Sequence, residues 1–186
     1  VDGRLGTRSE VREMAVCTIG EIVVKGPVVT RAYDHNEEET RLAKIADSSG
    51  FWHRMGDMGY LDERGRLWFC GRKAHRVFAA DEVLYTIPCE AVFNEHPAVR
   101  RSALVGVGEK GKQKPVLIVE LEKGSKGGNR LLAELQELGA QNPLTVTIKT
   151  FLVHAAFPVD IRHNAKIFRE KLALWAANQL REEEEG

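Results

Sequence analysis

The stretch FWHRMGDMGYLDERGRLWFCGRK, residues 51–73, carries the strongest structural signal in the sequence. Its centre, Asp62-Glu63-Arg64-Gly65, has the composition of a tight turn, and apolar and aromatic residues lie on both sides of it. We therefore predict a hairpin with strands at 60–61 and 67–69. Because strands this short cannot bury a core by themselves, we expect the hairpin to belong to a larger β-rich unit.

The residues before this hairpin extend the β-rich unit. Apolar runs predict strands at 14–18 and 21–24, the second ended by a Gly-Pro dipeptide. A helix is predicted at 37–46, where Asn36 is a suitable N-cap and apolar side chains recur at helical spacing. Residues 1–72 therefore form one predicted domain.

After Arg72 the pattern changes to alternating strands and helices. We predict a hairpin at 77–86, helices at 88–95, 131–138 and 167–180, and strands at 101–107, 115–121 and 145–153. This order is that of a compact α+β domain of about 110 residues, a typical domain size. We place the boundary between Arg72 and Lys73, so the second domain is 73–186. The acidic residues 182–185 are predicted to be a solvated, disordered tail.

The composition argues against several classes of function. The 27 basic residues balance 27 acidic ones, so no excess charge favours nucleic acid or a membrane surface. No apolar run approaches the roughly 20 residues of a membrane span, and the N-terminal residues are not of signal-peptide type. Three widely spaced cysteines without a C-x-x-C pair indicate reduced thiols, and no metal site is predicted. These features together predict a cytoplasmic protein.

Residues 106–112, GVGEKGK, have the spacing of a phosphate-binding loop but lack its other requirements. Such a loop continues with Ser or Thr to hold magnesium, and it leads into a helix. Here Gln113 follows, and Pro115 begins another apolar run. We therefore interpret the segment as a glycine-rich turn between two strands.

Four stretches, in order, resemble motifs of the adenylate-forming superfamily of acyl-CoA synthetases, luciferases and peptide-synthetase adenylation domains. They are GEIVVKGP at 20–27, WHRMGD at 52–57, DERGRLWFCGRK at 62–73 and NAKI at 164–167. The second has Met55 where the family usually has Thr. Each motif is short, but together they span almost the whole chain, which is identified as the C-terminal portion of such an enzyme.

The resemblance implies a small mobile C-terminal lid domain, preceded by a fragment of the β-rich barrel subdomain of the large N-terminal domain. It implies ATP as a substrate, and Mg²⁺ held in the missing N-terminal part. The family's Ser/Thr/Gly-rich phosphate loop and its Thr-Glu motif lie upstream and are not recognisable in this sequence. We therefore expect the chain alone to be inactive and to act together with the rest of the N-terminal domain.

The resemblance also assigns roles to individual residues. Asp57 would accept both ribose hydroxyls of ATP, because a carboxylate offers two acceptor oxygens. Arg72 would supply donors near the ribose and the phosphates. Lys73 would be the hinge between the large domain and the lid, unless the register falls on Ala74.

Lys166 is the predicted catalytic residue. Acyl adenylation brings a carboxylate to the α-phosphate of ATP, and an ammonium group between these two anions offsets their repulsion. His163 is a candidate acid or base or else a structural residue, and His154 has the same two interpretations.

Three longer stretches resemble more particularly the olefin-biosynthesis β-lactone synthetases: GPVVTRAY at 26–33, RLWFCGRK at 66–73 and FPVDIRHNAK at 157–166. This resemblance implies conversion of a 2-alkyl-3-hydroxy fatty acid to a β-lactone, with release of AMP and pyrophosphate. The substrate's own 3-hydroxyl would attack the acyl adenylate, and its high effective concentration offsets part of the ring strain. Other olefin-biosynthesis enzymes are the implied partners.

Three alternatives stay open. A fatty acyl-CoA synthetase would share the adenylation step, but such enzymes have a glycine where this sequence has Asp81 and a lysine where it has Phe78, which argues against CoA. A non-catalytic lid that binds a carrier or partner protein would tolerate loss of Lys166 in its binding. The third alternative is a piece of protein with no separate biological role.

Overall fold

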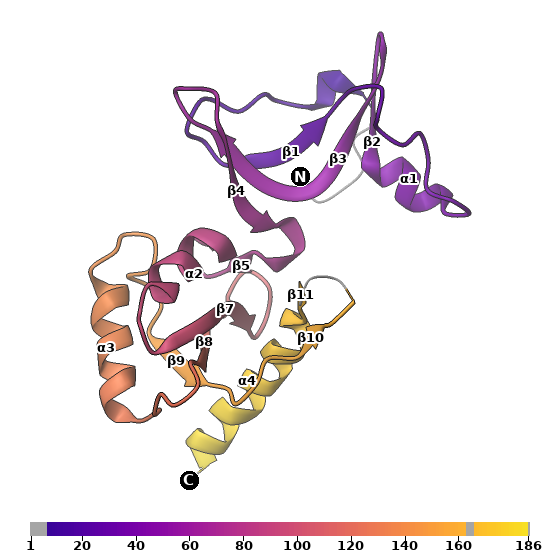
Figure 1. The fold of residues 1–186 in the computed structure, drawn as a ribbon. Helices are drawn as coiled ribbons and strands as arrows, with labels where there is room; N and C mark the ends of the chain where they lie inside the picture. Colours follow the sequence, from indigo (N-terminus) through magenta and orange to yellow (C-terminus); the bar gives the residue numbers. More distant parts are fainter. Residues whose placement is uncertain (1–6, 163–165, 186) are drawn as a thin grey trace. The chain divides into compact units, whose positions relative to one another are not determined.

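The computed structural model describes residues 7–162 and 166–185. The chain divides into two compact units, Val1–Ala74 and His75–Gly186, which Figure 1 draws as a ribbon. The division falls after Ala74, close to the predicted boundary between Arg72 and Lys73. Helices and strands are mixed along the chain, as the sequence predicts.

The first unit is an antiparallel sheet organised around one long strand, which Figure 1 shows as a bent arrow. This strand, β3 (Gly50–Leu61), pairs with β2 (Lys44–Asp47) near its start, with β1 (Gly20–Val24) further along and with β4 (Leu67–Arg72) at its end. The short helix η1 (Arg8–Glu10) precedes the sheet, and η2 (Lys73–His75) follows it.

The turn and the helix cap of this unit are as predicted. Gly65, in the turn between β3 and β4, has a φ of 72°, a left-handed conformation that glycine adopts without strain. Helix α1 (Glu37–Ala43) begins at Asn36, whose Oδ1 accepts the Glu39 N–H at 3.1 Å.

Two predictions for the first unit are wrong. Residues 14–18 form no strand, and the Thr18 N–H donates instead to the Ala15 carbonyl at 3.0 Å, which closes a turn. The predicted helix 37–46 ends early, because β2 begins at Lys44 and pairs with β3. Since Ile45 is 1% exposed, burial in the sheet outweighs the local helical periodicity.

The second unit is a three-stranded sheet between helices. Strand β8 (Lys114–Leu121) lies in the centre, antiparallel to β7 (Val99–Val107) and parallel to β9 (Thr150–Val153). The helices are α2 (Thr86–Asn94), α3 (Asn129–Ala140) and α4 (Arg169–Glu185). Two small hairpins complete the unit: β5 (Val77–Phe78) with β6 (Val83–Leu84), and β10 (Val159–Asp160) with β11 (Lys166–Ile167).

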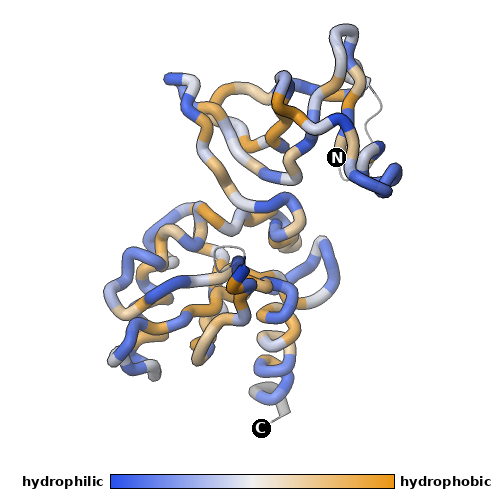
Figure 2. Tube along the Cα trace, turned by 45° about the vertical axis from the view of Figure 1, so that its right-hand side comes forward, coloured by the Kyte–Doolittle hydropathy of each residue, from blue (hydrophilic) through white to orange (hydrophobic). Residues whose placement is uncertain are grey.

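Both faces of this sheet are buried. Leu104, Leu117 and Val119 pack on the side of α2 and α3, and their neighbours Ala103, Val105 and Ile118 pack on the side of α4. Figure 1 shows α3 and α4 on opposite sides of the strands, and in Figure 2 both hydrophobic and hydrophilic residues follow one another along helix α4. Because each fully buried Val, Leu or Ile side chain contributes roughly 1.5–3 kcal/mol, the central strands form the stable base of the unit.

Several boundaries in the second unit differ from prediction. The predicted strand 145–153 is a strand only from Thr150, because the preceding residues form a turn in which the Thr145 hydroxyl donates to the Gly139 carbonyl at 2.9 Å. Helix α4 begins at Arg169, since residues 166–167 pair with β10, and it continues through 182–185, where the sequence predicts a disordered tail. A glycine-rich turn between the antiparallel strands β7 and β8 is confirmed, although residues 106–107 of the predicted range belong to β7.

Candidate active site

Asp57 and Arg72 face each other across the β3–β4 ladder, where their Cα atoms are register partners. Each follows a glycine in the left-handed region: Gly56 has a φ of 68° and Gly71 a φ of 112°. A residue with a side chain would be strained at either position. A β-bulge also interrupts the ladder beside this pair. The Gly-Asp and Gly-Arg dipeptides of the sequence are thus the backbone bends that bring a carboxylate and a guanidinium together.

Asp57 contains a buried acceptor atom that receives no hydrogen bond from the described residues. Its Oδ1 lies 3.1 Å from Nη1 of Arg72, which is ion-pair distance without hydrogen-bond geometry. That Nη1 instead donates to the Met55 carbonyl at 3.3 Å, and the Arg72 side chain is half-exposed. Because a buried oxygen without a donor is costly, the Asp57 carboxylate has unused hydrogen-bonding capacity within the described residues.

Lys73 is not an ordinary exposed lysine. Its side chain is 14% exposed, and its Nζ donates to Oε2 of Glu21 at 2.8 Å. Arg54 donates to the same carboxylate from Nε at 3.1 Å and from Nη2 at 2.8 Å. Burial is the largest single influence on the Glu21 pKa and raises it, but the two cations together outweigh burial and lower this pKa.

Glu21 and Arg54 are functional candidates that the sequence does not single out. Each lies inside a motif, at 20–27 and 52–57, but nothing local indicates that both meet Lys73. One signal in the sequence could have found them. An acidic residue in one motif and a basic residue in the other can form an ion pair if the two motifs lie on neighbouring strands, as β1 and β3 do. Together they hold the residue predicted as the hinge.

Lys166 is exposed and lies in the second unit, at the first position of β11, where its Cα partner is Asp160 of β10. His163 lies outside the described residues. His154 packs its ring edge-on against Trp175 at a centroid distance of 4.6 Å, and its Nδ1 accepts the Ala156 N–H at 3.2 Å. These contacts support the structural interpretation of His154.

The two residues that bear on a CoA acceptor, Phe78 and Asp81, belong to the β5–β6 hairpin. Asp81 is exposed in the connection between the strands. Phe78 makes two hydrogen bonds with Gln113: its N–H donates to the side-chain Oε1 of Gln113, and its carbonyl accepts the backbone N–H of Gln113, both at 2.9 Å. Arg76 and Lys110 lie over the Phe78 ring at 4.9 and 4.6 Å.

Within the described part of the chain, His, Cys, Asp and Glu side chains form no group of three that could hold a metal ion. None of its helices is long and apolar enough to cross a bilayer.

Solved structures share this fold, although no family model matches the sequence. The anthranilate–CoA ligase AuaEII, in complex with anthranoyl-AMP, has a TM-score of 0.78 at 20% identity, and the match covers 96% of this chain and 34% of that one. The ATP-bound MatB of Rhodopseudomonas palustris has a TM-score of 0.75 at 22% identity, with 94% and 34% covered. The fold is that of the C-terminal part of adenylate-forming enzymes.

Curated relatives agree with this class. The 2-succinylbenzoate–CoA ligase of Listeria monocytogenes is 33% identical over 162 residues, which cover 86% of this chain and 32% of the relative. The chain belongs to the adenylate-forming superfamily. Within it, the chain is 52% identical over 185 residues to the olefin β-lactone synthetase of Xanthomonas campestris, and 49% identical over 184 residues to that of Stenotrophomonas maltophilia. Each of these matches covers 96% of this chain and 33% of the relative, so the chain spans about a third of their length.

Proposed function

We propose that this chain is the C-terminal part of an ATP-dependent β-lactone synthetase that acts on 2-alkyl-3-hydroxy fatty acids. The observation that carries the proposal is the 52% identity to the Xanthomonas olefin β-lactone synthetase over 96% of the chain, against 33% for the 2-succinylbenzoate–CoA ligase. In this proposal residues 1–72 are the end of the β-rich subdomain, residues 73–186 are the mobile lid, and Lys73 is the hinge.

Asp57 and Arg72 fit the nucleotide part of the proposal. A ribose hydroxyl can donate to the Asp57 carboxylate, of which one oxygen accepts no hydrogen bond from the described residues. The half-exposed guanidinium of Arg72, 3.1 Å from this oxygen, offers donors to the ribose and the phosphates on the same side of the ladder. The Mg²⁺ site and the phosphate loop would lie in the rest of the N-terminal domain, as the resemblance to the adenylate-forming superfamily implies.

Lys166 fits the catalytic part. In the first step a carboxylate oxygen of the fatty acid bonds to the α-phosphorus, and the bond to pyrophosphate breaks. The exposed ammonium group of Lys166 stabilises the negative charge that gathers there. In the second step the 3-hydroxyl oxygen bonds to the acyl carbon, AMP leaves with its electron pair, and the hydroxyl proton is released.

The β5–β6 hairpin supports an internal acceptor. Asp81 places a carboxylate in the exposed connection, where a phosphopantetheine arm with its phosphates would meet a negative charge. A fatty acyl-CoA synthetase is the second candidate, and the 33% identity to a CoA ligase is the observation in its favour.

The test uses the complete enzyme that contains these residues, supplied with ATP, Mg²⁺ and a 2-alkyl-3-hydroxy fatty acid, with and without CoA. Proton NMR and mass spectrometry should detect a β-lactone in both mixtures. Lys166→Ala should lower the rate of product formation roughly 10²–10³-fold, as expected for loss of one charge-stabilising contact. Lys149→Ala, which removes another exposed lysine of the same unit, is the matched control. A thioester that forms only with CoA would replace the first candidate by the second.

A further inference from the structure

Residues 157–162 and 166–169, the described parts of the segment that contains Lys166, are attached at their outer ends to two buried carboxylates. The upstream end is held by Glu120 of the central strand β8, and the downstream end by Glu90 of α2. Both carboxylates are buried, with residue exposures of 3% and 4%. The proposed mechanism gives neither of them a chemical role.

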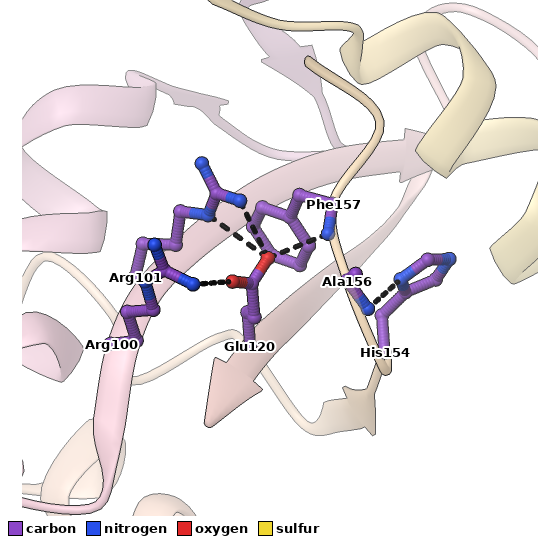
Figure 3. Close-up of polar contacts among 6 residues, drawn as sticks. All are labelled: Arg100, Arg101, Glu120, His154, Ala156 and Phe157. Carbon is purple, nitrogen blue, oxygen red and sulfur yellow. Dashed lines mark hydrogen bonds and ion pairs between the residues drawn. The ribbon is translucent and has the colours of Figure 1, made fainter. Parts of the chain in front are cut away.

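Glu120 receives four hydrogen bonds, and Figure 3 shows its carboxylate between two arginines and the backbone of Phe157. Its Oε2 accepts the Phe157 N–H at 2.6 Å and two donors of Arg101 at 3.0 and 2.7 Å, while Oε1 accepts from Arg100 at 3.0 Å. The Arg101 guanidinium also lies 5.3 Å from the centre of the Phe157 ring. Burial is the strongest influence on the Glu120 pKa and raises it, but these donors together lower it, so the carboxylate stays charged at neutral pH.

The downstream end is held in an equivalent way. Arg169, at the start of α4, donates from Nη1 to Oε1 of Glu90 at 2.6 Å and from Nη2 to Oε2 at 2.9 Å. Oε1 of Glu90 also accepts the N–H of Leu104 in strand β7 at 2.8 Å. A bidentate pair of this kind fixes both distance and orientation.

Backbone pairing joins these anchors to Lys166. The Phe168 N–H donates to the Pro158 carbonyl at 2.9 Å, directly inside the two anchored ends. The β10–β11 ladder continues from there, with Val159 opposite Ile167 and Asp160 opposite Lys166. A shift of either end would therefore move the Lys166 backbone.

We propose that Glu120 and Glu90 are positioning residues for Lys166, because they clamp both ends of its segment to the β7–β8 sheet and to α2. The inference rests on the proposed catalytic role of Lys166. Acyl-adenylate formation should reach its full rate only while both clamps hold Lys166 in position. A displacement of about 1 Å at a reacting centre can lower a rate by as much as a hundredfold.

The first experiment measures acyl-adenylate formation by the complete enzyme as ATP–pyrophosphate exchange. Glu120→Gln keeps the shape of the side chain and removes its charge, and it should lower kcat about tenfold to a hundredfold with KM for ATP changed less than about twofold. Glu134→Gln is the matched control, because Glu134 is also paired with an arginine, Arg130, but lies on the surface of α3. This control should keep the parent rate.

A double-mutant cycle separates positioning from general damage to the fold. If Glu120 acts through Lys166, Glu120→Gln should not lower the residual rate of Lys166→Ala any further. The same cycle with Arg169→Lys tests the Glu90 clamp, even if Glu120→Gln fails to fold. This substitution keeps the positive charge but loses the two parallel hydrogen bonds of the guanidinium to Glu90. Arg130→Lys is its control.

Hydrogen exchange of the 186-residue chain gives a readout independent of activity. The amide of Phe168 should exchange faster in Glu120→Gln and in Arg169→Lys, but not in either control variant. An unchanged kcat in both clamp variants, or an equal loss with and without Lys166, would overturn the inference. If Lys166→Ala itself kept the parent rate, the catalytic assignment under the proposed function would fail instead, so the two failures are distinguishable.

Discussion

Asp57 has the most specific chemical environment among the predicted nucleotide contacts, since one of its oxygens is buried without a hydrogen-bond donor. We predict that Asp57→Asn raises KM for ATP about tenfold in the complete enzyme, because an amide keeps only one of the two acceptor oxygens. Steady-state kinetics at varied ATP measures this. Asp47→Asn, at a carboxylate of the same unit paired with Lys25, is the control. An unchanged KM for ATP would remove Asp57 from the binding site.

The three cysteines should differ sharply in reactivity. Cys17 is exposed, whereas Cys70 and Cys89 are buried. Burial, with added effects of Glu90 and Glu82, raises the pKa of Cys89 to about 12, and burial also raises the pKa of Cys70. We predict that a thiol-specific reagent modifies Cys17 of the folded chain quickly, and Cys70 and Cys89 only after unfolding. Mass spectrometry of the labelled peptides checks this, and rapid labelling of Cys89 would contradict the structure.

At the residue scale, local chemistry was predictable and distant partners were not. The Asn36 cap and the Gly65 turn follow from preferences that act within a few residues. The Glu21 contact with Lys73 joins residues far apart in the sequence, and the Glu120 contact with Phe157 does too. No single-sequence pattern indicates such pairs, because the sheet register brings them together.

At the scale of elements, pairing with a neighbouring strand decided the segments where periodicity failed. Residues 44–46 continue an apolar helical pattern, yet they form β2 because β3 offers hydrogen bonds and a buried site for Ile45. Ile167, the first residue of the predicted helix 167–180, likewise lies in β11 and pairs with β10. Strands β7 and β8 were predictable, since burial on both faces produces long apolar runs.

The anchoring of the β10–β11 segment should depend on pH. The pKa of Glu120 is below its ordinary value of 4.5 in the folded chain, so its contribution to stability is present above about pH 4.5 and is lost as the pH falls through the folded value. Urea unfolding at several pH values should show a decrease in the free energy of unfolding toward acid. Glu120→Gln, which cannot titrate, should show a shallower decrease. Parallel pH profiles for the two proteins would contradict this linkage.

At the scale of the whole molecule, the two units have unequal cores. In the described part of the first unit the buried apolar side chains are Ala43, Ile45, Met58 and Cys70. Four large side chains of the β3–β4 hairpin are about half exposed there: Leu61, Leu67, Trp68 and Phe69. The second unit buries one cluster on each face of its sheet.

We therefore predict that residues 75–186 fold when expressed alone and that residues 1–74 do not. Residues 75–186 should give a cooperative thermal transition and dispersed amide resonances, because their two apolar clusters are complete within the unit. Residues 1–74 should show neither, because they leave a large apolar surface in water. Thermal unfolding can be monitored by circular dichroism. A cooperative transition of residues 1–74 alone would contradict the conclusion that their core is too small to fold independently.

The class of the whole molecule was accessible from the sequence because its motifs span nearly the full length. The resemblance to the β-lactone synthetases is confirmed by relatives at 52% and 49% identity. The clamps around Lys166 were not accessible, since Glu90 and Arg169 are remote in sequence and ordinary in type.

The separate attachment of the two hairpins in the second unit has a consequence for evolvability. Gln113 ties down the hairpin with Asp81, whereas Glu120 and Glu90 hold the segment with Lys166. Mutations around Asp81 can therefore accumulate while the lysine keeps its scaffold. In the proposed function, this separation predicts that residues 77–84 can be exchanged for those of a CoA-dependent relative without moving the Lys166 segment.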